Sequence, residues 1–221
     1  MSGRGPIFRP GASAKFRAGL LLAVVFLLAV GDATFAFYHS PWWSRVGFAP
    51  PQPVLFSHRH HAGELRIDCR YCHSSVETSP FAGMPPTETC LSCHSQIFTT
   101  TAMLRPVVAS AETNQPLQWR RVTRMPDFVY FDHHIHVAKG IGCTSCHGAV
   151  GEMALTAKGE RLDMRQCLDC HRDPTPFLRT EQEIFAPTWT PPADQKSRGP
   201  ALAAHYGLSL RHLNNCSTCH R

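Results

Sequence analysis

The placement of cysteine constrains this chain more than any other feature. The 221 residues include ten cysteines, and all ten fall in five copies of one short pattern, Cys-x-x-Cys-His. The copies are CRYCH (Cys69, Cys72, His73), CLSCH (Cys90, Cys93, His94), CTSCH (Cys143, Cys146, His147), CLDCH (Cys167, Cys170, His171) and CSTCH (Cys216, Cys219, His220). A chain of this length does not need five disulfides to hold a core. The cysteines therefore serve chemistry.

Cys-x-x-Cys-His is the attachment signature of c-type haem. Two thiols one turn apart reach the two vinyl groups of one porphyrin, and the adjacent histidine lies under the iron as its proximal ligand. Zinc ribbons also use paired Cys-x-x-Cys, and disulfides or thioredoxin-like sites use close cysteines, but none of these requires the histidine. The sequence predicts five covalently attached haem c groups, with the ten cysteines as attachment points. The five motif histidines would bind the irons.

A longer pattern repeats around these motifs. Phe56-Ser-His58-x-x-His61 begins 13 residues before Cys69, and the matching Phe131-Asp-His133-x-x-His136 begins 12 residues before Cys143. Each copy precedes two haem signatures, which indicates a duplicated two-haem module. We divide the chain into a basic tail (1–17), an apolar anchor (18–38), a two-haem module (39–105), a connector (106–124) and a three-haem module (125–221).

The repeated histidines are candidate distal ligands, because each haem iron has a second axial position. Histidines three apart share one face of a helical turn but diverge enough to serve different irons. The candidates are His58, His61, His133 and His136. The neighbouring His60 and His134, and His39 near the anchor, are expected to be bystanders.

One distal position then lacks a ligand. Met164, three residues before Cys167, is the favoured candidate, and a methionine ligand would raise the potential of that haem. The alternatives are His205, His212, Met84 and Met153.

The N-terminal region reads as a membrane anchor. Residues 18–38 are apolar apart from Asp32 near the outer end, and about 20 apolar residues span the hydrocarbon layer. Residues 1–17 carry four basic and no acidic side chains, which predicts a cytoplasmic N-terminus and a periplasmic haem region at the inner membrane. Tyr38, Trp42 and Trp43 fall where aromatic belts form. The alternative is a signal peptide cleaved near Ala36.

The charge balance argues against a nucleic-acid-binding protein, and the chain length argues against a separate polypeptide core around each haem. Beyond residue 38 basic and acidic side chains nearly balance, which disfavours nucleic-acid binding. Between His58 and Arg221 about 33 residues are available per haem, too few to enclose each porphyrin separately. The expected fold class is a multihaem cytochrome c, mostly short helices and irregular loops packed round stacked haems, with one N-terminal transmembrane helix.

Four local elements can also be predicted. Thr87 is expected to cap a helix through Cys90 to Ile97, and Thr180 with Glu183 fits a capping box. Residues 127–131 are expected to be extended, and residues 152–161 to form a small hairpin around Lys158-Gly159.

The F-x-H-x-x-H arrangement resembles class III cytochromes, the tetrahaem c3 and trihaem c7 proteins. In that family the first histidine of the pair binds the haem that follows, and the second reaches a neighbouring haem. The resemblance implies that His58 binds the first haem and His133 the third. It implies that His61 and His136 bind neighbouring haems.

From Pro41 onward the chain is similar to the pentahaem subunit of alternative complex III, a bacterial quinol oxidase assembly. The blocks that carry this resemblance are PWWSRVGFAPPQPVLFSHRHHAGELRIDCRYCHSSVE, AGMPPTETCLSCHSQI, MPDFVYFDHHIHVAKGIGCTSCHG and MRQCLDCHRDP. It implies an electron-transfer subunit without catalytic residues of its own. The implied partners are an iron–sulfur subunit and integral membrane subunits that oxidise quinol, with a soluble or membrane cytochrome c or a terminal oxidase as acceptor.

Two other functions compete with this one. A multihaem reductase with one open iron, of the pentahaem nitrite reductase kind, typically has a C-x-x-C-K site, which this sequence lacks. A membrane-anchored quinol dehydrogenase of the tetrahaem type places a haem site shortly after its anchor, whereas 30 residues separate Tyr38 from Cys69 here.

Overall fold

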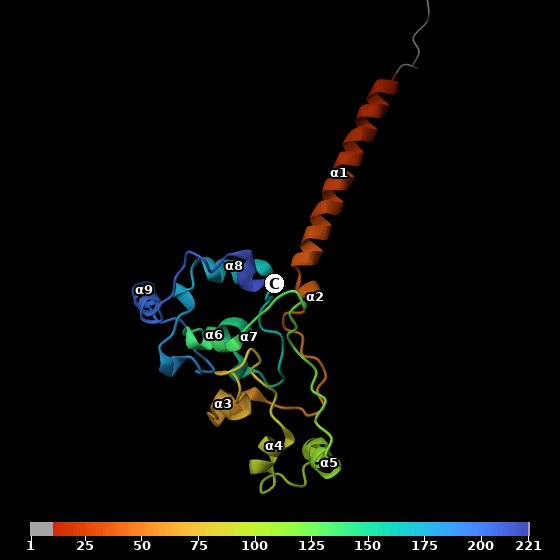
Figure 1. Ribbon diagram of the computed structural model, residues 1–221. Helices are drawn as coiled ribbons and strands as arrows, with labels where there is room; N and C mark the ends of the chain where they lie inside the picture. Colours follow the sequence, from red (N-terminus) through yellow and green to blue (C-terminus); the bar gives the residue numbers. More distant parts are fainter. Residues whose placement is uncertain (1–10, 221) are drawn as a thin grey trace, which may run out of the picture. The chain divides into compact units, whose positions relative to one another are not determined.

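The computed structural model describes residues 11–220, and the chain divides into two compact units, Met1–Arg45 and Val46–Arg221. Figure 1 follows the elements along the chain. In order they are α1 (Ala12–His39), α2 (Pro41–Ser44), the π-helix η1 (Arg59–Glu64), α3 (Cys69–Cys72), α4 (Thr87–His94), η2 (Ala102–Leu104), α5 (Arg105–Thr113), α6 (His133–Ala138), α7 (Thr144–His147), η3 (Val150–Glu152), α8 (Met164–Arg172), η4 (Thr175–Phe177), η5 (Glu181–Glu183), α9 (Gln195–His205) and α10 (Cys216–Cys219). The segments η2 to η5 are 3-10 turns.

The first unit is built on α1, which contains the whole predicted segment 18–38. Its 28 residues include an 18-residue window with a mean hydropathy of 2.4, and none of that window is buried within the protein. At 1.5 Å per residue the helix is about 42 Å long, more than the roughly 30 Å of a hydrocarbon layer. Helix α1 is therefore a candidate membrane span.

Aromatic side chains gather where α1 ends. Ser40 is extended and Pro41 opens the short helix α2, so the chain turns directly after His39. The ring of Trp43 lies 4.6 Å from the ring of Tyr38 and 5.7 Å from that of Phe37, centre to centre. This places an amphipathic aromatic cluster at one end of the apolar helix, as an interfacial belt requires.

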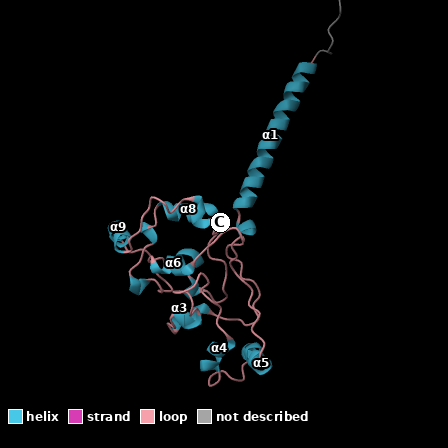
Figure 2. Ribbon diagram, in the orientation of Figure 1, coloured by secondary structure: helices cyan, strands magenta, loops and turns pink. Residues whose placement is uncertain are grey.

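The second unit consists of short helices joined by loops, as Figure 2 shows. Within the described residues from 46 to 220 there is no strand, and β pairing is limited to two isolated bridges, Val129 with His220 and Ile141 with Leu178. This is the predicted architecture of a multihaem cytochrome c domain.

Aspartates fix where three of the short helices begin. Each accepts a hydrogen bond from a backbone N–H of the first turn: Asp68 from Arg70 in α3, Asp132 from Ile135 in α6 and Asp163 from Gln166 in α8. N-terminal caps of this kind satisfy donors that have no partner inside the helix. All three helices carry candidate haem residues, so the caps help to set the positions of those residues.

The polypeptide's own apolar core is small. One cluster joins Val76, Val137 and Ile184, and another joins Leu178, Leu202 and Ala203. Among the helices, α9 packs on η4, α4 on α5 and η1 on η3. A Cβ at Gly63 in η1 would overlap the Gly151 carbonyl in η3, so this contact requires glycine.

The local predictions had mixed outcomes. The capping box of Thr180 and Glu183 is confirmed, on the 3-10 turn η5. The predicted cap at Thr87 is wrong: the helix starts at that residue, ends at His94, and the Thr87 hydroxyl lies 2.6 Å from the Ser110 hydroxyl in a buried contact. The Thr87 side chain therefore forms a tertiary contact with α5 instead of capping the helix.

Two segments that were predicted to be extended have a different conformation in the structure. Residues 152–161 form no hairpin, because the backbone of Lys158 pairs with a distant segment. The Gly47 N–H donates to the Lys158 carbonyl at 2.7 Å, and the Lys158 N–H donates to the Phe48 carbonyl at 3.2 Å. Residues 127–128 form a turn, and pairing begins only at Val129, which bridges to His220. In both places a distant backbone supplies the hydrogen bonds.

Candidate metal centres

Each Cys-x-x-Cys-His motif lies on a single helical turn. Three of them form the isolated turns α3, α7 and α10, and two lie within α4 and α8. In the first, third and fifth motifs the histidine N–H donates to the carbonyl of the first cysteine at 2.9 Å. A turn of this kind puts both thiols on one side and the histidine next to them, and none of the ten cysteines forms a disulfide.

Four motif histidines face a second histidine from elsewhere in the chain. The ring centres are 6.4 Å apart for His58 and His73, 6.2 Å for His61 and His94, 6.2 Å for His133 and His147, and 6.1 Å for His136 and His171. An imidazole nitrogen bonds a metal ion at about 2 Å and its ring centre lies about 1 Å further, so two imidazoles on opposite sides of one iron have centres about 6 Å apart. The spacing therefore fits one haem iron per pair.

The two repeats share the same geometry. The rings of His58 and His73 are inclined by 5°, and those of His133 and His147 by 6°. The second pairs are rotated further, by 65° for His61 with His94 and by 34° for His136 with His171. Both angles fit two ligands of one iron, because an imidazole could turn about its nitrogen–metal bond without losing that bond.

Hydrogen bonds at Nδ1 orient these rings. Nδ1 lies within bonding distance of a backbone carbonyl in His61 (Ser57, 2.9 Å), His73 (Gly83, 2.7 Å), His94 (Ile97, 3.3 Å), His133 (Pro80, 2.8 Å), His136 (Asp132, 2.7 Å), His171 (Leu213, 2.7 Å) and His220 (Phe128, 3.1 Å). A carbonyl only accepts, so Nδ1 carries the proton and donates. The lone pair is then on Nε2, which is the arrangement that metal-binding histidines use.

Burial keeps the inner rings neutral. It lowers the pKa of His58 to about 4, with smaller contributions from His73, His61 and His147. It also lowers the pKa of His147 to about 4 and lowers the pKa of His136. A neutral imidazole has the free lone pair that an iron ligand requires.

Phenylalanine rings fix the angle between the two histidines of each repeat. Phe56 contacts His58 edge-on at 4.9 Å and 88°, and lies almost parallel to His61 at 4.5 Å and 27°. In the second repeat, Phe131 makes the same two contacts, at 4.8 Å and 87° with His133 and at 4.4 Å and 27° with His136. The repeat of phenylalanine is evident in the sequence, but only the fold shows that each ring contacts both histidines of its repeat.

The thiols of successive motifs approach one another in a definite order. The Cys72 thiol interacts with that of Cys90, which joins the first and second motifs. The Cys69 thiol donates to the Phe185 carbonyl and lies close to the thiol of Cys143, so the first motif neighbours the third.

The order continues through the last three motifs. The Cys146 thiol lies close to those of Cys170 and Cys167, and the Cys167 thiol lies close to that of Cys219. The motifs therefore follow one another in space as second, first, third, fourth and fifth. Figure 1 shows α4, α3, α7 and α8 succeeding one another in this sense.

The fifth motif differs from the other four. The ring neighbour of His220 is Phe128 at 5.8 Å, and no second imidazole faces it among residues 11–220. Met164 is 63% exposed at the start of α8, one turn before Cys167, whose thiol is the one that approaches Cys219. This puts Met164 on the turn of α8 that neighbours the fifth motif.

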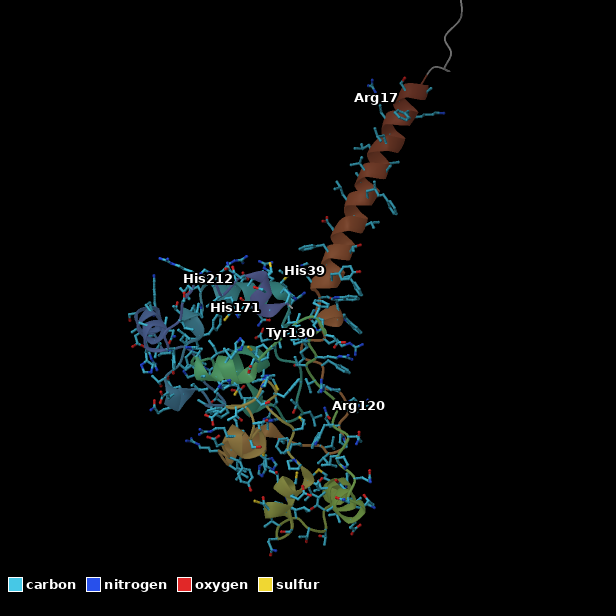
Figure 3. The ribbon with its side chains drawn as sticks, in the orientation of Figure 1. Arg17, His39, Arg120, Tyr130, His171 and His212 are labelled. Carbon is cyan, nitrogen blue, oxygen red and sulfur yellow. The ribbon has the colours of Figure 1, made fainter. Side chains whose placement is uncertain are left out.

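The alternatives to Met164 have other surroundings. His205 lies 3.9 Å from Glu181 and against the ring of Tyr206. His212 lies next to Leu213, whose carbonyl accepts a hydrogen bond from His171. Figure 3 labels His171 and His212. Met84 is 58% exposed beside Gly83, and the end of the Met153 side chain lies near Gly148. None of them is brought into a ring contact with His220.

The expected bystanders lie outside the pairs. His60 is exposed and bonds Glu64 through Nδ1 at 2.9 Å. His134 is exposed, although it immediately follows His133. His39, at the end of α1, bonds the Phe35 carbonyl at 2.9 Å. Within each F-x-H-x-x-H pattern, the structure thus separates the two paired histidines from the one between them.

The comparisons show a similarity to multihaem cytochromes. Residues 129–221 match the family model for cytochrome c7 and related cytochrome c. A curated relative, the multiheme cytochrome c subunit of menaquinone reductase from Nitratidesulfovibrio vulgaris (strain Hildenborough), is 30% identical over 141 residues, which cover 62% of this chain and 60% of the relative. The chain carries a cytochrome c7-like multihaem domain, and the paired histidines and attachment turns fit covalently bound haem c.

Proposed function

We propose that this protein is a membrane-anchored pentahaem c-type cytochrome that conducts electrons within a quinol-oxidising complex of the alternative complex III type. The observation that carries the proposal is the set of four imidazole pairs, each joining a motif histidine to a distal histidine about 6 Å away. Irons ligated on both faces exchange electrons but have no open position for a substrate.

The proposed ligands follow from these pairs. His58 and His73 would hold the first haem, His61 and His94 the second, His133 and His147 the third, and His136 and His171 the fourth. His220 would hold the fifth haem, with Met164 as its distal ligand. Haem c bound by these residues would supply one-electron ferric/ferrous redox chemistry at each site.

The chain's contribution is to order the haems. The contacts among the thiols support a path through the second, first, third, fourth and fifth haems. The second and fifth sites are then the two ends of the path, where partner proteins would deliver or accept electrons. The repeats bring their first and third sites together in the middle of this path.

The position in the cell is proposed from α1. Its apolar length supports an anchor in the inner membrane, with the basic residues 1–17 in the cytoplasm and the haem domain on the periplasmic side. The proposed partners are an iron–sulfur subunit and integral membrane quinol-oxidising subunits. The proposed acceptor is a periplasmic or membrane cytochrome c or a terminal oxidase.

The comparison supports a second candidate, in which electrons flow in the opposite direction, from the haems to a quinone. The relative is named as a subunit of a menaquinone reductase, which would send electrons from the haems into a quinone pool. The same haem path serves either direction, because the potentials of the partners decide which way electrons move. The two candidates differ in the partner that binds at each end.

One preparation tests the proposal. The protein is extracted in mild detergent, its subunits are identified, and its intact mass is measured. Five porphyrins on the polypeptide, an iron–sulfur subunit and multi-span membrane subunits, together with quinol-dependent haem reduction, are expected. Fewer than five porphyrins, or stoichiometric carbon monoxide binding to the reduced protein at a bis-histidine site, would contradict it. Reduction of an added quinone by the pre-reduced complex, without the reverse reaction, would favour the second direction.

A further inference from the structure

Arg179 is the most deeply buried charged residue described, with 1% of its surface exposed. Its backbone is fixed on both sides, since its N–H donates to the Gly140 carbonyl at 2.9 Å and its carbonyl accepts from the Tyr206 hydroxyl at 2.8 Å. The guanidinium lies over the ring of Trp189, 4.1 Å from its centre. A cation held this firmly in the interior calls for a specific partner or a specific role.

The guanidinium is bonded to the third attachment motif, CTSCH. It donates from one Nη to the hydroxyls of both intervening residues, to Thr144 at 2.6 Å and to Ser145 at 3.0 Å. It also packs on Gly142, where any Cβ would overlap it, directly before Cys143. Arg179 therefore contacts the motif along its length, between the two proposed thioether bonds.

The charge of Arg179 is not neutralised locally. Glu183 accepts from Thr180 and forms its ion pair with Arg198 rather than with Arg179, which reaches only the Glu183 backbone carbonyl. The Arg179 Nε has no hydrogen-bond partner among the described residues. The Glu183 carboxylate still exerts an attraction, but two arginines share that one carboxylate, which leaves one net positive charge.

One carboxylate near the motif acts in the opposite sense, and its contribution is unchanged when Arg179 is replaced. Glu160 acts on Cys146 and accepts from Gln166 at 3.4 Å. Burial lowers the pKa of Arg179, yet a guanidinium stays protonated throughout the physiological range. Because the site is buried, its field is screened less than that of a surface charge.

We propose that Arg179 raises the reduction potential of the third haem, the middle of the path. The inference rests on the proposed attachment of that haem through Cys143 and Cys146. An added electron lowers the charge of the iron centre, and a fixed cation beside the attachment turn stabilises that reduced state. Arg179 does not ligate the iron, so its effect is electrostatic.

The test is a redox titration of the full-length, detergent-solubilised protein, followed in the visible spectrum and by EPR. Arg179→Met removes the charge and keeps the length. It should lower the equilibrium constant for reduction of one haem about tenfold, which is about 59 mV for a one-electron couple. Arg179→Lys retains the charge and should leave the same step within threefold of the wild type. The EPR signal that shifts should be the one that His133→Met also changes.

The control is Arg105→Met, which removes an exposed arginine at the start of α5 and should move no step. If Arg179→Met does not accumulate, Glu183→Gln removes the shared carboxylate and should raise the same step. Unchanged titration, equal shifts for Met and Lys, or a shift at another haem would overturn the proposal. Intact mass on the same sample separates this failure from loss of the third haem, which would instead contradict the proposed function.

Discussion

The Nδ1 of His133 donates to the carbonyl oxygen of Pro80, 2.8 Å away and 53 residues earlier in the chain. The His133 N–H donates to the same carbonyl at 3.2 Å. The reverse exchange also occurs, since Nδ1 of His58 lies 2.9 Å from the Thr156 hydroxyl. Each repeat therefore orients a distal histidine of the other, which couples the geometry of the first and third sites.

His61→Ala is expected to convert one haem from low spin to high spin, because it removes the ring that faces His94 at 6.2 Å. EPR and the visible spectrum of the oxidised protein measure the change, and the reduced variant should bind about one equivalent of carbon monoxide. His60→Ala is the matched control: among the described residues its exposed ring pairs with Glu64 and with its neighbour His61 but faces no motif histidine, so all haems should stay low spin. A fully low-spin His61→Ala variant would show that the ligand assignment is wrong.

Phe131→Leu is expected to lower the free energy of unfolding by about 1–2 kcal/mol, because two aromatic contacts are lost, with His133 and with His136. Guanidinium titration monitored at the haem bands measures it. Phe81→Leu, at a side chain that is 69% exposed, should change stability by less than about 0.5 kcal/mol. Equal losses for the two variants would mean that Phe131 does not support the histidine pair.

Met164→His is expected to lower the midpoint potential of one haem, because an imidazole replaces a thioether as the proposed distal ligand of the fifth iron. Spectroelectrochemical titration should show one step falling by a tenfold or larger change in equilibrium constant, about 59 mV or more. Met103→His, at another exposed methionine, is the control and should leave all steps in place. If Met164→His titrates like the wild type, the assignment moves to His205 or His212.

Asp163→Ala is expected to destabilise α8 by about 1 kcal/mol at neutral pH, because it removes the N-terminal cap. The backbone N–H of Gln166 and the side chain of Arg161 hold the pKa of Asp163 below its ordinary value of 3.8. A carboxyl with a lowered folded pKa stabilises the protein above that ordinary value and loses the contribution as the pH falls through the folded value.

The difference between wild type and Asp163→Ala should therefore shrink below about pH 4. Chemical denaturation at a series of pH values measures it. Asp169→Ala removes an exposed carboxylate of the same helix and serves as the control, with an expected change below about 0.5 kcal/mol. A difference that persists unchanged at low pH would exclude the charged cap as its source.

The helical turns of the Cys-x-x-Cys-His motifs and the apolar N-terminal helix could be predicted from sequence because both depend on local spacing. Two thiols and an imidazole within five residues, such as Cys143, Cys146 and His147, need one helical turn to act together. In the same way, 18–38 needs only to be continuous and apolar. The capping box at Thr180 and Glu183 was predictable for this reason as well.

The tertiary structure alone decided which distant groups meet. The partner of His61 is His94, the carbonyl that orients His133 belongs to Pro80, and Lys158 pairs with Gly47 and Phe48. Sequence spacing carries no information on such contacts, because the loops between the short helices have no period that would fix their path. The buried charge of Arg179 could not be predicted for the same reason. Its burial and its unpartnered Nε depend on residues that only the fold brings next to it.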